Sequence, residues 1–284
     1  MKHYLVLLAC LGIGVEAFSQ STLYQTSPQQ VLDHQLELFD KQLFSATLYD
    51  NSRLLNQNLT GEQQKSAELH RAMAALQLES PDGPGLMKSY ILDHGKHPSV
   101  TTAGLYLGDH FFYKKNYQEA IEGYALVNAN GLNEANKAEV LFKQGYAYFQ
   151  LKNYGQAAPF FDQAKVLNQA ISPDAYYYSG FIAMVTANSS KAITDLQAAG
   201  KSSFYATKVP YLISALYYQE GNYDQVIGYA EPLLASGQNL DRKETIHLYL
   251  AEAYYAKKSF ANAAKNYDAF ILSLIHISEP TRPY

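Results

Sequence analysis

The histidines are the side chains best suited to binding a metal ion, and His94 and His97 form the closest pair. A zinc site normally needs three or four ligands at recognisable spacings. No cysteine lies near this pair, and the two Asp-His dipeptides, which begin at residues 33 and 109, are isolated. We therefore interpret the histidines as loop or surface residues and expect no metal site.

Catalytic motifs are missing from the sequence as well. It contains no G-x-S-x-G nucleophile turn, no H-E-x-x-H metal motif and no phosphate loop that ends in Gly-Lys-Ser or Gly-Lys-Thr. The 17 glycines are dispersed and form no cradle for a phosphate group. We expect no catalytic residues and no bound cofactor, and we predict that the protein is not an enzyme.

The charge and composition of the chain exclude some classes of protein and of binding partner. The 284 residues include 22 Lys and Arg against 26 Asp and Glu, for a net charge of -4, and 48% are hydrophobic. This composition excludes a disordered chain. The basic pairs Lys114-Lys115 and Lys257-Lys258 are far fewer than the phosphate contacts that nucleic-acid binding requires. We expect no nucleic-acid partner.

The N-terminus reads as a secretory signal peptide over residues 1–20. Lys2 precedes an apolar run of about a dozen residues, and Ala17-Phe18-Ser19 is a small-x-small cleavage site. The run is too short for a membrane anchor, which needs about 20 apolar residues. An alternative is a lipoprotein, because the letters that end at Cys10 match an acylation motif. We predict an exported protein, in the periplasm or associated with the outer membrane.

The C-terminal residues 272–284 look foreign to the rest of the chain. The string LSLIHISEPTR resembles the translation of a sequencing adapter, whereas the alternative is an ordinary helix end followed by a Pro-rich tail. The adapter interpretation predicts that this tail is non-native and that the chain is the N-terminal fragment of a longer protein.

The sequence between the signal peptide and the C-terminal tail contains a repeated pattern. Five segments of about 20 residues align without gaps, and a small residue falls at one register of each. These small residues are Gly108, Gly145, Gly180, Ser214 and Ala251, at spacings of 37, 35, 34 and 37 residues. A period in this range indicates a solenoid of stacked helical hairpins.

Close helix packing explains the small residues. Glycine inside a helix costs about 1 kcal/mol relative to alanine, so three glycines at one register need a structural cause. A second helix that crosses the first at short distance would supply it. The residues twelve positions further on are also mostly small, and they are Ala120, Ala157, Ala192, Val226 and Ala263.

This pattern resembles the tetratricopeptide repeat (TPR), a 34-residue helix-turn-helix that contains L-G-x2-Y, a later Ala and an aromatic residue. The resemblance implies an all-α fold, a right-handed α-solenoid with about seven repeats. It covers residues 101–271 as five repeats. Residues 21–100 read as two divergent TPR-like helical hairpins, with helices expected at 28–40, 42–58, 62–78 and 85–93. The chain is similar to exported TPR proteins of Bacteroidota, although it lacks the usual Trp.

The TPR resemblance also implies where a partner binds. In such arrays the first helix of each hairpin lines a concave groove, and ten of the 25 residues at groove positions are aromatic. We predict a partner-binding groove formed by Phe112, Tyr113, Phe142, Tyr146, Phe149, Tyr177, Phe181, Tyr211, Tyr218 and Tyr255. The alternative is that these rings are half-buried between adjacent first helices and serve packing alone.

These inferences predict an exported TPR scaffold that binds a protein or peptide partner through the aromatic groove. One alternative is a TPR component of outer-membrane protein assembly. Another is a module that binds glycan or peptidoglycan, so association with the outer membrane or cell wall is also considered.

Overall fold

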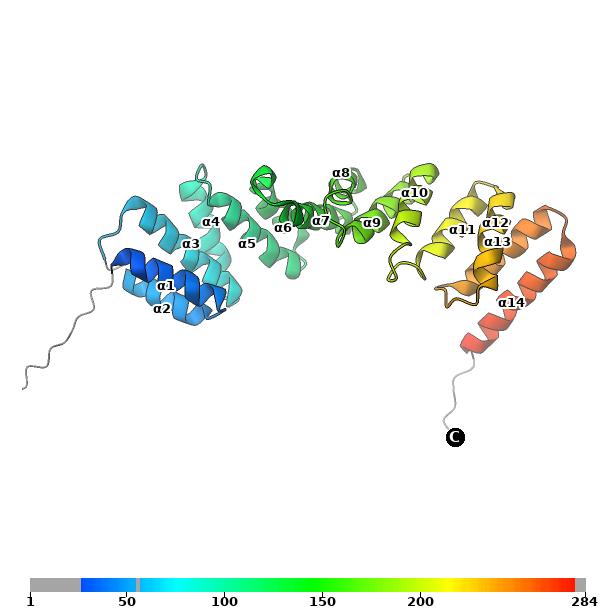
Figure 1. Ribbon diagram of the computed structural model, residues 1–284, viewed down its shortest axis with the longest axis horizontal. Coiled ribbons are helices and arrows are strands. Elements are labelled where there is room, and N and C mark those ends of the chain that lie inside the picture. Colours follow the sequence, from blue (N-terminus) through cyan, green and yellow to red (C-terminus); the bar gives the residue numbers. More distant parts are fainter. Residues whose placement is uncertain (1–26, 55–56, 279–284) are drawn as a thin grey trace, which may run out of the picture. The chain divides into compact units, whose positions relative to one another are not determined.

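The computed structural model describes residues 27–54 and 57–278, with side chains up to residue 273 (Figure 1). This part of the chain is all-α, as predicted, and consists of 14 α-helices and one short 3-10 helix, η1 (Ala129–Gly131). Consecutive α-helices form seven hairpins, of which we name the first helix A and the second helix B. The predicted signal peptide lies outside the described residues.

The chain divides into two compact units, residues 1–70 and 71–284, with the boundary inside helix α3 (Gly61–Gln77). The first unit contains α1 (Pro28–Asp40), α2 (Phe44–Leu54) and the beginning of α3. Its small core consists of Val31, Leu32, Leu54 and Ala67.

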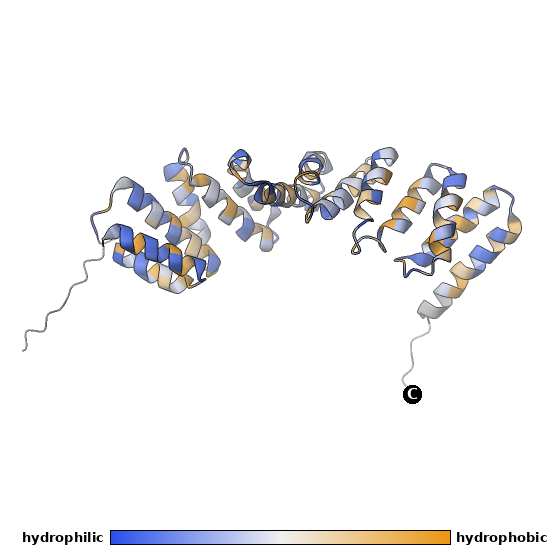
Figure 2. Ribbon diagram, in the orientation of Figure 1, coloured by the Kyte–Doolittle hydropathy of each residue, from blue (hydrophilic) through white to orange (hydrophobic). Residues whose placement is uncertain are grey.

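The second unit contains the end of α3 and eleven further α-helices. Their bounds are α4 (Gly83–His94), α5 (Val100–Tyr113), α6 (Tyr117–Ala125), α7 (Glu134–Gln150), α8 (Tyr154–Ala164), α9 (Ser172–Val185), α10 (Ser189–Ala199), α11 (Val209–Gln219), α12 (Tyr223–Ala235), α13 (Lys243–Ala256) and α14 (Phe260–Ser278). From α5 onward each helix packs against its neighbours in sequence, as in TPR stacking. Figure 2 shows hydrophobic and hydrophilic residues alternating along these helices, as expected for elements that each bury one face.

The small residues lie where the two helices of a hairpin cross, which confirms the predicted register. A Cβ on Gly108 would lie 2.5 Å from Cδ1 of Tyr124, and a Cβ on Gly180 would lie 2.9 Å from Cγ of Leu196. The five residues twelve positions after the small ones are all buried. A larger residue at this register would separate helix A from helix B.

The turn between helices A and B has one conformation throughout the array. At the end of each helix A the backbone enters the left-handed region, with φ between 53° and 68°, and in the last five hairpins this residue lies seven positions after the small residue. These residues are Gln42, Glu79, Lys115, Lys152, Ala187, Gly221 and Lys258. In the last five hairpins the next residue is Asn or Ser, and Asn153, Asn188 and Asn222 each accept a hydrogen bond from the backbone N–H three positions on. The left-handed residue ends helix A and the asparagine begins helix B.

The hydrophobic core of the second unit is shared between hairpins. Phe161 of α8 is fully buried, in a cluster with Leu141 of α7 and with Ala175 and Ile182 of α9. A similar cluster joins α9, α10 and α11. Each hairpin therefore completes its core with the next hairpin.

At the C-terminal end of the described chain, the backbone of residues 272–278 continues α14. Residues 279–284 lie outside the described part. The adapter origin of this segment stays a prediction. Within the described residues, no helix combines the length and the apolar character needed to cross a membrane.

Candidate functional site

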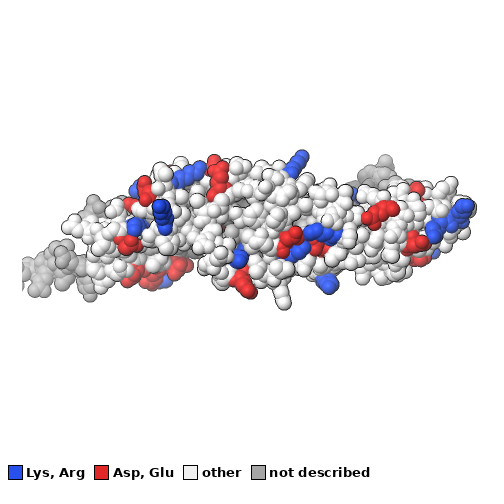
Figure 3. Space-filling model, turned by 90° about the horizontal axis from the view of Figure 1, so that it is seen from above, with Lys and Arg blue, Asp and Glu red and all other residues white. Residues whose placement is uncertain are grey.

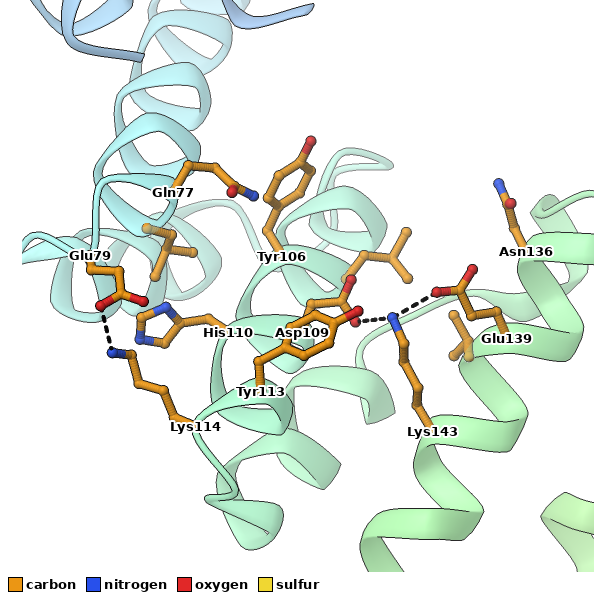
Figure 4. Close-up of a pocket in the computed structure, with 13 residues that line it drawn as sticks. Gln77, Glu79, Tyr106, Asp109, His110, Tyr113, Lys114, Asn136, Glu139 and Lys143 are labelled. Atoms are coloured by element: carbon orange, nitrogen blue, oxygen red, sulfur yellow. Dashed lines mark hydrogen bonds and ion pairs between the residues drawn. The ribbon is translucent and has the colours of Figure 1, made fainter. Parts of the chain in front are cut away.

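A pocket of about 490 Å³ opens on the A helices α3, α5 and α7 of the second unit (Figure 4). Its walls combine aliphatic, aromatic and charged side chains. The lining residues are Leu76, Gln77, Glu79, Leu105, Tyr106, Asp109, His110, Tyr113, Lys114, Asn136, Glu139, Val140 and Lys143. Successive turns of α5 supply one wall, because Leu105, Asp109 and Tyr113 lie on the same face of the helix at i, i+4 spacing.

Asp109 is fixed in the pocket by the helix behind it. Gly108 has no side chain, so the buried Tyr124 of α6 packs directly against α5. From there the Tyr124 hydroxyl donates a hydrogen bond of 2.5 Å to Oδ1 of Asp109. Burial raises the pKa of Tyr124 above its ordinary value, and the charge of Asp109 raises it further, so the phenol remains a donor.

Lys143 of α7 joins the two sides of the pocket. Its Nζ lies 2.8 Å from Oδ1 of Asp109 and 2.7 Å from Oε1 of Glu139, and Figure 4 shows the ammonium group between these carboxylates. The side chain is only 10% exposed. Burial alone would lower the pKa of Lys143, but the hydrogen bonds and charges of Asp109 and Glu139 outweigh it and raise the pKa above its usual value. Lys143 is therefore protonated, and the carboxylates of Asp109 and Glu139 balance its positive charge.

A second ion pair lies at the other end of the pocket. Lys114 Nζ lies 3.3 Å from Oε2 of Glu79. Burial lowers the pKa of the neighbouring His110, and the positive charge of Lys114 contributes to the shift. Both effects favour the neutral form of the His110 imidazole.

The predicted groove residues lie mainly between A helices. Eight of the ten are half-buried, and only Tyr113 and Tyr255 are exposed. The ring centroids of Phe112 and Tyr146 are 5.7 Å apart, and those of Phe149 and Phe181 are 5.7 Å apart. Each of these pairs joins an A helix to the next one. Within this set, Tyr113 alone lines the pocket.

Most of the remaining predicted groove residues make similar contacts across hairpins, whereas Tyr255 contacts Phe260 of its own hairpin. Tyr178, which the sequence did not single out, contacts the rings of Phe142, Tyr146 and Phe149, at 5.9, 5.3 and 5.0 Å respectively. Three further contacts join Tyr177 to Tyr205, Tyr218 to Tyr249, and Tyr211 to the guanidinium of Arg242. The rings thus hold successive A helices at a set spacing.

Lys143 and Tyr124 could not be recognised from their positions in the sequence as parts of a site. One sequence signal could have indicated the pairing of Tyr124 with Asp109. In two hairpins, an acidic residue directly follows the small residue, and a tyrosine lies fifteen positions after that acidic residue. Tyr124 donates to Asp109, and Tyr267 donates to Oε1 of Glu252 at 2.7 Å. No comparable spacing marks Lys143.

A second polar cluster lies between α8, α9 and α10. Lys165 and Lys191 both donate to Asp162 and to Asp195, at distances of 2.6–3.1 Å. The Ser179 hydroxyl lies within hydrogen-bond distance of both carboxylates, 2.9 Å from Oδ1 of Asp162 and 2.8 Å from Oδ2 of Asp195. Two lysines neutralise two aspartates here, so we interpret the cluster as a structural network rather than a binding site. Nowhere in the described residues do three or more potential ligands group so as to hold a metal ion.

The stacked hairpins, the crossing at a small residue and the pocket on the A helices define a TPR-like helical-repeat protein. The chain matches no protein-family model and no curated protein sequence. Among solved structures it is similar to the MamA protein, with a TM-score of 0.51, 21% identity, and coverage of 66% of this chain and 100% of that one. It is also similar to the apo form of RapI, with a TM-score of 0.50, 12% identity, and coverage of 86% of this chain and 75% of that one.

A tetratricopeptide repeat protein from Parabacteroides merdae ATCC 43184 matches with a TM-score of 0.48 and 11% identity, over 86% of this chain and 91% of that one. At these identities the MamA and RapI similarities establish the fold alone.

Proposed function

We propose that this protein is a non-enzymatic exported scaffold that binds a peptide segment of a partner protein on its A-helix face. Stacked helical repeats generally use an extended face of this kind to bind other proteins. The observation that carries the proposal is the pocket across α3, α5 and α7, which combines apolar walls with a few polar groups.

Tyr113 is the predicted groove residue on which the proposal mainly rests. Tyr113 is 70% exposed and lines the pocket. A tyrosine ring supplies a large rigid contact area with a polar tip, and tyrosine is enriched at binding hot spots. In this proposal the half-buried rings space the A helices, and Tyr113 contacts the partner.

The surface favours a peptide over a highly charged polymer. On the face that Figure 3 shows, basic and acidic side chains are interspersed and most of the surface is uncharged. The packing of the rings against one another supports the same preference, because a glycan platform needs exposed aromatic faces.

The test is a selection of random peptides displayed on phage, with the full chain as bait. Peptides enriched on the wild type should bind the Tyr113→Ala variant at least tenfold more weakly, as expected for a hot-spot residue. Tyr49→Ala is the matched control, because Tyr49 is 67% exposed and lies on α2, outside the predicted groove. Equal affinity for wild type and Tyr113→Ala would refute a binding site at this pocket.

Export needs its own test, because it rests on residues 1–20. Expression in a Gram-negative host should place the chain in the periplasm or the outer-membrane fraction, with the signal peptide removed. Mass spectrometry of the mature N-terminus would distinguish simple cleavage from acylation at Cys10. An intact N-terminus in the cytoplasmic fraction would exclude export.

A further inference from the structure

We propose that the pocket on α3, α5 and α7 receives a basic side chain of the bound peptide, and that it prefers arginine. Asp109 and Glu139 are the acceptors, Tyr113 is the stacking surface, and Lys143 is a positioning residue that holds the two carboxylates in place. The inference rests on the proposed peptide-binding function and specifies its ligand chemistry.

The charge balance of the pocket favours a cation. Three carboxylates line it, those of Glu79, Asp109 and Glu139, against the two ammonium groups of Lys114 and Lys143. Burial favours the uncharged form of His110, because it lowers the pKa of the imidazole. The walls therefore carry one net negative charge, which a single basic side chain would neutralise.

Asp109 and Glu139 each have one carboxylate oxygen that can still accept a hydrogen bond from a ligand. Tyr124 and Lys143 both bond to Oδ1 of Asp109, and Lys143 bonds to Oε1 of Glu139. Within the described residues, Oδ2 of Asp109 and Oε2 of Glu139 have no hydrogen-bond donor. Both side chains are partly exposed, at 40% and 52%, so a ligand can reach them.

An anionic ligand fits the same pocket poorly. The Nζ of Lys143 is nearly buried and already bonds to two carboxylates, so an anion would have to displace one of them. Lys114 is likewise paired with Glu79. A carboxylate on the ligand would also approach three carboxylates of the wall, and like charges at short range disfavour binding.

The aromatic wall favours arginine over lysine. Tyr113 and Tyr106 both line the pocket, and Figure 4 shows the Tyr113 ring beside Asp109. A planar guanidinium can stack on a tyrosine ring and donate to carboxylates in the same plane, whereas an ammonium group presents only a point charge. A cation already lies near the Tyr113 ring, because Nζ of Lys143 is 5.3 Å from the ring centroid.

The direct test uses N-acetyl-arginine amide as the probe and NMR chemical-shift mapping on the full chain. Titration should shift the signals of residues that line the pocket. N-acetyl-citrulline amide, which has nearly the same shape without the charge, should leave them in place. Glu139→Gln should weaken binding of the arginine probe about tenfold, because a hydrogen bond between charged groups is lost.

The matched control variant is Glu122→Gln. Glu122 is an exposed carboxylate of α6 that does not line the pocket, and its variant should bind the probe like the wild type. Equal shifts with the citrulline probe, or no pocket shifts with the arginine probe, would overturn the inference.

The phage selection separates this inference from the proposed function. If the enriched peptides depend on Tyr113 but carry no excess of arginine or lysine, the scaffold function stands and the basic-side-chain pocket is wrong. If no enriched peptide depends on Tyr113, the proposed function itself fails.

Discussion

Tyr124 lies so close to Gly108 that a Cβ at position 108 would stand 2.5 Å from its ring. The same tyrosine donates a hydrogen bond of 2.5 Å to Asp109, the residue that follows this glycine. A single small residue therefore sets both the crossing of α5 with α6 and the position of a carboxylate in the candidate pocket.

Gly108→Ala should destabilise the protein by about 2 kcal/mol, because the added methyl group overpacks a tight helix crossing. Urea denaturation would measure the change. Gly228→Ala is the control, since Gly228 lies inside α12 and a Cβ there would have nothing within 4 Å. That variant should gain about 0.5–1 kcal/mol from its higher helix propensity. Equal effects of the two substitutions would contradict the close crossing.

The left-handed turns predict opposite effects at two equivalent positions. Gly221 has φ of 68°, and Gly221→Ala should cost about 1 kcal/mol because a Cβ is unfavourable in this conformation. Lys152 has φ of 59°, so Lys152→Gly should stabilise by about 0.5–1 kcal/mol. Thermal or urea denaturation of both variants would show whether the two signs differ. The same sign for both would mean that these turns do not share one conformation.

Alkaline pH should weaken the fold. Burial raises the pKa of Tyr124, and burial raises the pKa of Tyr229 to about 12, whereas phenols in an unfolded chain titrate near 10. Above about pH 10 the unfolded chain therefore loses protons that the native state retains, and the free energy of unfolding falls as pH rises. Lys143 also makes the free energy of unfolding fall at alkaline pH, because its pKa is raised in the native state.

The variant that checks this pH dependence is Tyr124→Phe. It should lose about 1 kcal/mol at neutral pH with its hydrogen bond, and its stability should fall less steeply above pH 10. Denaturation curves at several pH values, with tyrosinate absorbance followed in parallel, would measure both quantities. An unchanged slope would mean that Tyr124 is not a source of the alkaline loss.

Asp195→Asn should destabilise the protein by about 3 kcal/mol. Asp195 is nearly buried and bonds to Lys165, Lys191 and Ser179, so its loss leaves two partly buried ammonium groups with one carboxylate. Asp224→Asn is the matched control, because Asp224 is 77% exposed in its pair with Lys257 and should cost less than about 1 kcal/mol. Comparable losses in the two variants would mean that the buried network adds nothing beyond a surface pair.

The hairpins could be predicted from the sequence because close packing of two helices requires small residues at one register. Gly145 and Gly180 are costly inside a helix unless another helix crosses there, and the structure places Phe161 and Leu196 against them. The shared turn conformation was less visible, because Lys152 and Ala187 adopt a positive φ that their residue types do not suggest.

The candidate pocket could be predicted only in part. The repeat register placed Tyr113 on the A-helix face, where it lines the pocket. It could not show whether Tyr146 faces solvent or the next A helix, because that depends on the distance between hairpins. The pairing of Lys143 with Asp109 joins residues 34 positions apart, and it arises only when α5 and α7 are stacked.

The constancy of the turns has an evolutionary and practical consequence. In the last five hairpins the left-handed residue follows the small residue by seven positions, so differences in repeat length fall after the turn, in helix B or the link to the next hairpin. Insertions and deletions are therefore tolerated best in the link of residues 126–133, whereas the link of residues 201–208 carries the buried Tyr205 and tolerates them less well. The link of residues 126–133 is the natural point at which to attach labels, splice in extra repeats or join this array to another.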